Sequence, residues 1–345
     1  MLRAFWPSSK LKNNMKKRVS ILALEDSIAT YIMGPMDIFS LAGILWNMIR
    51  DESLSPYFQV EIVSLCGKAV NCQNGAIIQP HRSMEDVKKT DLIIISSASG
   101  NIEWSMDYHK KAIPWLRKHF ENGTHIASIC TGAFLLAETG LLNNKTATTH
   151  WGFIDFFKER YPFVNVIPEK LITDEGNLFC SAGANSGLDL SMYLIERYCG
   201  HKIMLETSKS LVLNVNRYYQ APFALFSGNK SHKDKDILTS QEWMEEHYSG
   251  KIQIESVSAM VNMSLRTFNR RFKKATGETP SNYVQLLRIE AAKNLLETEQ
   301  ESVESIAYRV GYEDTSFFRK VFKRFVCVTP NAYRKSFQKI HSIDY

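Results

Sequence analysis

Residues 18–213 alternate between two hydrophobic patterns. Short runs of apolar and β-branched residues predict buried strands at 18–24, 58–65, 91–98 and 124–129. Stretches with an apolar residue at every third or fourth position predict helices at 34–50, 106–123, 132–142, 186–200 and 201–213. This alternation indicates an α/β fold with a mostly parallel sheet that is covered on both faces.

The pattern lapses after this region. Residues 219–236 have no clear period and are rich in small and charged residues, which is typical of a linker. The chain beyond them has helical periodicity only, so we expect an all-α domain at 237–340. The first domain then spans 18–218, and residues 1–17 form a basic extension that we expect to be disordered. Met15 is an alternative start, because the first strand pattern begins only at Arg18.

The helical half contains an internal repeat. Residues 257–274 can be aligned with 306–324 at an offset of 49, which places Asn262 on Gly311. After one inserted residue, Phe268 aligns with Phe318 and Phe272 with Phe322. Each copy predicts a short helix, a tight turn and a second helix. Glycine and asparagine are the residues that best tolerate a positive φ, as such a turn requires.

The second helix of each copy has one polar, basic face. One such stretch alone would be read as an ordinary amphipathic helix pair, but two in register indicate a pair of DNA-reading units. A helix with arginine and asparagine on one face can enter the major groove and bind guanine and adenine. The predicted DNA-contacting residues are Arg266, Asn269 and Arg270 in the first unit and Thr315, Ser316, Arg319 and Lys320 in the second. The helix expected at 281–298 would separate the units by about 27 Å, close to one turn of DNA.

Composition and charge agree with this picture. The 345 residues are 44% hydrophobic and 23% charged, which is typical of globular domains, and the net charge is +6. Residues 266–274 carry five cations and no acid. Six scattered cysteines favour neither a disulfide framework nor a metal site, and we expect no cofactor. The chain shows neither a signal-peptide pattern nor an apolar run that could span a membrane, so we expect a cytoplasmic protein.

The helical half resembles the DNA-binding domain of the AraC/XylS transcription regulators. The resemblance rests on SLRTFNRRFKKATGETPSNYV, RIEAAKNLLE and IAYRVGYEDTSFFRKVFKR with the later TPNAYR. It implies that the predicted contacting residues bind double-stranded DNA. Two positions depart from the family pattern: Ser258 stands where alanine is usual, and Cys327 where glycine is usual. The second departure predicts strain in the loop before the last helix.

Cys130 lies between the strand at 124–129 and the helix at 132–142, where the sequence predicts a sharp turn. Such an elbow holds its side chain near the first amides of the helix, so we expect a lowered thiol pKa and an affinity for anions. His150 is a candidate base or hydrogen-bond partner. The alternative is that both residues serve packing alone.

Residues 18–215 resemble the ThiJ/PfpI superfamily, whose class I glutamine amidotransferase-like fold has a flavodoxin-like parallel sheet. The motifs are MGPMDIFSLAG, SICTGAFLLAETGLLNNKTATTHW and CSAGANSGLDLSMYLIE. Both halves together resemble the GlxA-like regulators. Superfamily enzymes pair the elbow cysteine with an acid, but the corresponding position here is Tyr31, and Glu25 and Asp26 are out of register. The protease-like branch has histidine after the cysteine, where this chain has Thr131.

We therefore predict a transcription regulator whose first domain senses a small ligand or mediates dimerisation. The predicted ligand-binding residues are Tyr31, Gly34, Cys130, Thr131 and His150, around a degenerate rather than catalytic site. Expected partners are double-stranded DNA, a small-molecule effector and a second copy of the chain, with RNA polymerase as a further candidate. Two alternatives remain: an enzyme that uses Cys130 on a small amide, isocyanide or aldehyde, and a thiol redox sensor.

Overall fold

We describe a computed structural model of the chain that covers residues 16–97, 101–183, 185–214, 217–226 and 228–338. The chain forms two compact units, Met1–Gln220 and Ala221–Tyr345, and each is described by itself. Most of the predicted N-terminal extension, residues 1–15, lies outside the described residues. Among the helices described, none combines the length and the apolar composition that crossing a membrane requires.

The first unit is built on a seven-stranded sheet with the order β10-β11-β7-β6-β1-β2-β5. Its strands are β1 (Lys17–Leu22), β2 (Phe58–Ser64), β5 (Arg82–Ser83), β6 (Leu92–Ile95), β7 (His125–Ile129), β10 (Ile172–Asp174) and β11 (Leu178–Ser181). All neighbours are parallel except β10, which runs antiparallel to β11. The five main strands follow the flavodoxin-like order 2-1-3-4-5, so the predicted fold is confirmed.

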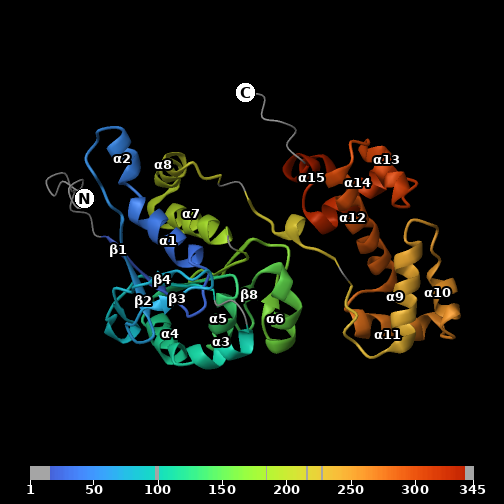
Figure 1. Ribbon diagram of the computed structural model, residues 1–345, viewed down its shortest axis with the longest axis horizontal. Coiled ribbons are helices and arrows are strands. Elements are labelled where there is room, and N and C mark those ends of the chain that lie inside the picture. The colour runs from blue at the N-terminus through green and yellow to red at the C-terminus, as the bar shows by residue number, and fades with distance from the viewer. Residues whose placement is uncertain (1–15, 98–100, 184, 215–216, 227, 339–345) are drawn as a thin grey trace. The chain divides into compact units, whose positions relative to one another are not determined.

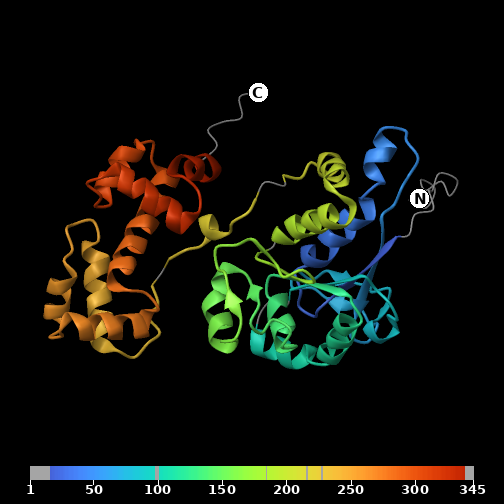
Figure 2. The same ribbon diagram turned by 180° about the vertical axis from the view of Figure 1, so that it is seen from behind.

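Helices cover both faces of this sheet (Figures 1 and 2). One face carries α1 (Thr30–Leu41), α7 (Ser186–Cys199) and α8 (His201–Leu211), whereas the other carries α3 (Ile102–His109), α4 (Ala112–Glu121) and α5 (Gly132–Glu138). Strand β6 therefore consists entirely of buried residues, as a central parallel strand requires. The remaining elements are α2 (Leu45–Ile49), α6 (Ile154–Arg160) and the short strand pairs β3–β4 (Val70–Asn71, Ile77–Ile78) and β8–β9 (Thr146–Ala147, Asn165–Val166).

Some boundaries differ from the sequence prediction. The helix expected at 34–50 begins at Thr30 and breaks after Leu41, because Gly43 has a φ of +74° and lies against the backbone of Ser55. The helix expected at 106–123 is divided into α3 and α4. Strands β10 and β11 were not predicted, since a three-residue and a four-residue strand carry little periodic signal.

In the described part of the second unit, every regular element is a helix, and loops join these helices. They are α9 (Lys235–His247), α10 (Ile254–Met260), α11 (Leu265–Thr276), α12 (Pro280–Thr298), α13 (Val303–Arg309), α14 (Thr315–Val326) and α15 (Pro330–Phe337). Helix α12 runs from the α9–α11 group to the α13–α15 group (Figure 1). Tyr283 and Val284 near its start belong to the first apolar core, whereas Ile289, Ala292 and Leu296 belong to the second.

Much of the segment predicted as a linker packs against the helical unit. The Phe226 ring packs edge-to-face against Tyr283, with ring centroids 5.2 Å apart, and Phe223 contacts Phe337. The buried Lys293 donates a hydrogen bond from its ammonium to the carbonyl oxygen of Ala224 at 2.5 Å. The compact helical unit thus starts at Ala221, because aromatic side chains in this aperiodic stretch reach distant partners.

The two predicted turns have the expected backbone. Asn262 has a φ of +54° and Gly311 a φ of +91°, and each follows the first helix of its unit. The strain predicted after α14 is also present: Cys327 has a φ of +64°, where the corresponding residue after α11 is Gly277 with a φ of +83°. The repeat therefore extends to the residue that ends each second helix.

We expect Cys327→Gly to raise the free energy of unfolding by about 1 kcal/mol, measured by urea denaturation of the whole chain. Left-handed backbone costs a residue with a Cβ about 1–2 kcal/mol, and the greater freedom of glycine in the unfolded chain offsets part of the gain. Gly277→Ala is the matched control and should destabilise, since open space around Gly277 leaves backbone strain as the sole cost. Equal stability of Cys327→Gly and the wild type would show that the loop bears no strain.

Candidate functional site

Helix α11 carries the first predicted reading face. The Ser264 side chain caps its N-terminus by accepting a hydrogen bond from the Thr267 amide. Phe268 and Phe272 are fully buried, and the Phe272 ring packs edge-on against Tyr283 at 5.2 Å. Burial of this stripe turns the opposite face of the helix to solvent. The exposed residues there include the three predicted contacts, Arg266, Asn269 and Arg270.

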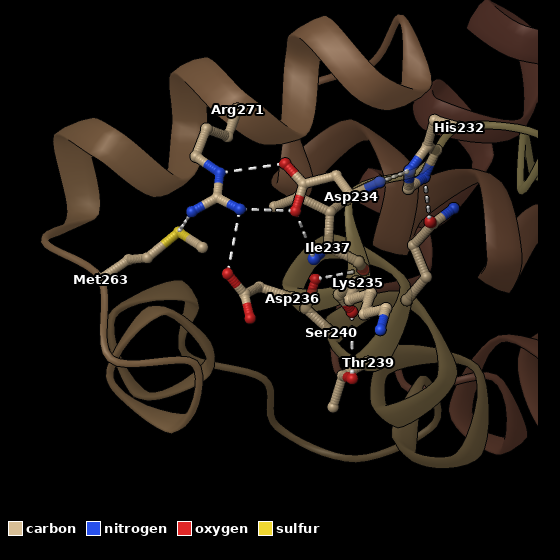
Figure 3. Close-up of polar contacts among 10 residues, drawn as sticks. His232, Asp234, Lys235, Asp236, Ile237, Thr239, Ser240, Met263 and Arg271 are labelled. Atoms are coloured by element: carbon tan, nitrogen blue, oxygen red, sulfur yellow. Dashed lines mark hydrogen bonds and ion pairs between the residues drawn. The ribbon is translucent and has the colours of Figure 1, made fainter.

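One arginine in the basic run serves a different purpose (Figure 3). The Arg271 guanidinium donates to both carboxylate oxygens of Asp234, at 2.9 and 2.6 Å, and to Asp236 at 2.9 Å. These hydrogen bonds lower the pKa of Asp234. Asp234 also caps α9 by accepting from the Ile237 amide. Arg271 therefore ties the reading helix to the start of α9, a role that sequence reasoning missed.

Helix α14 carries the second predicted reading face. Asp314 caps it by accepting from the amides of Ser316 and Phe317, at 2.7 and 3.2 Å. The buried stripe is Phe318, Val321 and Phe322. Ser316, Arg319 and Lys320 are exposed on the other side, and Thr315 is half-buried. All four predicted contacts thus share one accessible surface at the start of the helix.

Two further residues border this second face. Glu304 on α13 accepts a hydrogen bond from the exposed Arg319 guanidinium. Phe317 is 48% exposed although it is a large apolar residue. A phenyl ring beside a reading face can contact the methyl group of thymine. The repeat alignment places Thr267 at the corresponding position of the first unit. A phenylalanine where the other copy has a polar residue could have drawn attention to this position from the sequence alone.

The first unit contains the predicted elbow. Cys130 joins β7 to α5 with a φ of +55°, which is rare for a residue other than glycine. The close approach of Gly132 to the carbonyl oxygens of Ile95 and Ser96 requires glycine at the start of α5. The Tyr31 hydroxyl hydrogen-bonds with both the Cys130 thiol and the Ser97 side chain. We call Tyr31, Ser97, Cys130 and Thr131 the elbow site.

The electrostatics of the elbow site differ from the prediction. Burial raises the pKa of the Cys130 thiol, and the hydrogen bonds from Tyr31 and Thr131 only oppose this effect. The predicted lowering of the thiol pKa is therefore wrong. Burial also raises the pKa of Tyr31, and the neighbouring Cys130 thiol raises it further. Both groups are protonated near neutral pH, so the site holds neither a thiolate nor a base.

Two of the predicted ligand-binding residues make contacts with groups other than the thiol. His150 accepts a hydrogen bond from the Gly152 amide at 3.1 Å, and its ring lies against Trp151 and Gly183. Gly34 is where α1 approaches α7, because a Cβ there would lie 2.5 Å from Leu188. The sequence motif brought together Tyr31, Cys130 and Thr131, but its flanking residues serve local capping and helix packing.

Glu25, one of the two acids that follow the first strand, is engaged elsewhere. The Glu25 carboxylate accepts a hydrogen bond from the Asn71 side chain at 2.7 Å. The residues that influence the thiol in the part of the chain described are Tyr31 and Thr131. The position of an acid in superfamily enzymes is thus taken by a neutral hydroxyl.

A thiol-labelling experiment tests this description. At pH 7, iodoacetamide should alkylate Cys66 at least about tenfold faster than Cys130, because Cys66 is exposed whereas Cys130 is buried and protonated. Peptide mass spectrometry of the intact chain gives both rates in one sample. The rate at Cys130 should increase only in alkaline solution, because burial raises the pKa of its thiol. Preferential labelling of Cys130 at pH 7 would contradict a buried, neutral thiol.

The geometry defines a class of protein before any comparison. Two capped helices with basic faces, each preceded by a short helix and a positive-φ turn, form a double helix-turn-helix DNA-binding unit. An α/β unit with a buried cysteine elbow precedes it.

Comparison with known proteins gives the family. The DJ-1/PfpI family matches residues 17–197, more than half of the 345 residues, and the chain belongs to this family. A helix-turn-helix domain matches residues 257–336. The HTH-type transcriptional regulator CdhR of Pseudomonas aeruginosa is 28% identical over 281 residues, which are 80% of this chain and 82% of that protein. The HTH-type transcriptional regulator GlxA of Rhizobium meliloti is 26% identical over 224 residues, 64% of this chain and 68% of GlxA.

A solved structure shares the fold. The crystal structure of a putative transcriptional regulator protein from Vibrio parahaemolyticus aligns with a TM-score of 0.50 and 23% identity, over 57% of this chain and 99% of that one. The chain thus combines a DJ-1/PfpI domain with an AraC-type helix-turn-helix region. This is the domain composition of an HTH-type, DNA-binding transcription regulator, as the sequence predicted.

Proposed function

We propose that this chain is a sequence-specific transcription regulator whose first unit senses a small molecule and does not catalyse a reaction. The observation that carries the proposal is the pair of matched reading helices, each with its basic face open to solvent. Arg266, Asn269 and Arg270 contact one stretch of the major groove, and Thr315, Ser316, Arg319 and Lys320 contact the next.

The elbow site supports a sensing rather than a catalytic role. Nucleophilic catalysis by cysteine needs a thiolate and a group that transfers protons. Here burial raises the pKa of the thiol, and its partner is the protonated Tyr31 hydroxyl. A sensor needs only that its ligand bind two states of the protein with different affinity. A second copy of the chain and RNA polymerase complete the proposed set of partners.

Selection of DNA from random fragments by the full-length protein tests the function. We expect enrichment of one sequence with two half-sites about one helical turn apart, because α12 fixes the separation of the two readers. Recovery of fragments without a common sequence would refute specific recognition. Exposure to dilute peroxide before a gel shift then tests the redox alternative, and the sensor proposal expects unchanged affinity.

A further inference from the structure

The elbow site is closed in this structure. Tyr31, Cys130 and Thr131 are 4, 5 and 2% exposed, and the Tyr31 hydroxyl lies against the thiol. A ligand of ordinary size could enter only if these side chains moved. The effector that the proposed function requires therefore needs a different entrance or a different site.

An open cavity lies elsewhere in the first unit. Its volume is about 840 Å³, within the range of small-molecule sites. Strand β10 and helices α7 and α8 form three of its walls, and residues 217–219 form another. Ile172, Met192, Met204 and Leu205 supply apolar surface, and Tyr218 and Tyr219 supply rings that are 66 and 39% exposed.

The charged groups that line this cavity leave one ammonium without an ion pair among the described residues. Its three carboxylates each have a cationic or imidazole partner within the first unit. Asp174 binds Arg197 at 2.9 Å, Asp189 binds Arg217, and Glu196 binds His201 at 2.6 Å. By contrast, the ammonium of Lys170 makes no ion pair with any residue in the described ranges.

Arg217 adds hydrogen-bond donors to the same cavity. A guanidinium has five N–H donors, and Arg217 uses its Nε and Nη2 atoms to donate to the Asp189 carboxylate. No hydrogen bond within the described residues uses Nη1, so its donors remain for a ligand, together with the hydroxyl groups of Tyr218 and Tyr219. The Lys170 ammonium and these donors thus face a cavity that is lined by both apolar and polar side chains.

One wall of the cavity leads directly to the end of the first unit. Tyr219 forms a β-bridge with Lys170, and the Leu171 amide donates to the carbonyl oxygen of Tyr218 at 3.1 Å. The next residue, Gln220, is 2% exposed. Its side-chain amide donates to the Thr149 carbonyl at 2.9 Å and accepts from the Trp151 amide at 2.9 Å. The helical unit begins at the following residue, Ala221.

We propose that this cavity is the effector site and that its ligand is a small organic carboxylate with an apolar or aromatic body. The proposal rests on the proposed regulatory function. The carboxylate binds Lys170 and the remaining donors of Arg217, while the body of the ligand packs between Tyr218 and the methionines. Binding changes how residues 217–220 are held, and this segment is the covalent connection to the DNA-binding unit.

The test uses the full-length protein and probes of matched shape. Phenylacetate, benzoate and hexanoate represent the ligand class, and phenylacetamide and phenethylamine are the neutral and cationic counterparts of the first. Isothermal titration should detect binding of at least one carboxylate but of neither counterpart. Lys170→Met should weaken that binding about tenfold or more, because it removes a charge-assisted hydrogen bond. Lys158→Met, which removes an exposed lysine from α6, should leave it unchanged.

A gel shift on the selected DNA site then measures the coupling. The binding carboxylate should change the DNA affinity of the wild type but not that of Lys170→Met, and both proteins should bind equally without ligand. Tyr31→Phe should retain carboxylate binding, since the elbow site is separate from the cavity.

Three results would overturn the inference. They are binding of phenethylamine in preference to phenylacetate, no binding of any carboxylate at millimolar concentration, and loss of binding in Tyr31→Phe but not in Lys170→Met. The last result would place the effector at the elbow site and leave the regulatory function intact. Absence of specific DNA binding, in contrast, refutes the proposed function whatever the titrations show.

Discussion

Arg270→Ala and Lys320→Ala should each weaken specific DNA binding by about 1–3 kcal/mol, which corresponds to roughly 5- to 150-fold in affinity. Both side chains are exposed on reading faces whose opposite sides are fully buried. The double variant should lose close to the sum, because the two residues belong to different helix-turn-helix units. Gel shifts on the selected site at several salt concentrations give the affinities and the salt slopes.

The salt slope separates the two kinds of contact. A side chain that binds a base edge discriminates among sequences, whereas one that binds a phosphate weakens binding to all sequences and reduces the slope by about one unit. Lys158→Ala removes one positive charge far from the reading faces along the chain and serves as the control. Wild-type affinity in both Arg270→Ala and Lys320→Ala would show that the reading surface is assigned to the wrong faces.

Arg271→Ala should behave differently from its neighbour Arg270→Ala. It removes the ion pairs with Asp234 and Asp236, so the free energy of unfolding of the helical unit should fall. Because the guanidinium is already engaged, the salt slope of DNA binding should change less than in Arg270→Ala. A slope that falls by a full unit in Arg271→Ala would make Arg271 a phosphate contact.

Gly311→Ala should destabilise the helical unit by about 2–3 kcal/mol and abolish tight DNA binding. The residue has a φ of +91°, and a Cβ there would lie 2.6 Å from the carbonyl oxygen of Ser249. The Arg288 guanidinium lies 3.0 Å from the same point and is held by the carbonyl oxygens of Tyr248 and Gly250. The turn therefore cannot move away from the new methyl group.

The corresponding turn in the first unit provides the matched control. Asn262 already has a side chain at a φ of +54° and is exposed, so Asn262→Ala should cost only about 1 kcal/mol. Urea unfolding of the whole chain, followed by a signal from the helical unit, compares the two variants. Equal losses for Gly311→Ala and Asn262→Ala would mean that the approach of Ser249 does not restrict the turn.

Features that depend on local sequence could be predicted. The two turns, their positive φ and the strain at Cys327 follow from residue types at fixed positions in a repeat. The nearness of Tyr31 to Cys130 was expected from the superfamily resemblance, in which this position pairs with the elbow cysteine, and the two side chains hydrogen-bond. The buried stripes of α11 and α14 follow directly from helical periodicity.

Features that depend on distant packing could not be predicted. The pKa of Cys130 is raised because α1 and the strand ends enclose the thiol, whereas the elbow pattern alone predicted a lowered pKa. The engagement of Arg271 depends on Asp234, which lies 37 positions earlier in an aperiodic stretch. The place of His150 in a ligand site stays a prediction: its contact with the Gly152 amide is local, and the neighbouring Thr149 hydroxyl donates to the Cys130 carbonyl oxygen at 2.8 Å.

Helix α12 has a consequence for how this protein can change in evolution. Its side chains belong to both apolar cores of the helical unit, so its length sets the rotational phase between the two readers. One inserted residue would turn everything beyond it by about 100° around the helix axis. The two reading faces could then no longer enter the major groove on the same side of the DNA. The residue count between Pro280 and Thr298 is therefore expected to be more constrained than the identity of the exposed residues within it. Deletions and duplications in this stretch should be tolerated far less than those in surface loops.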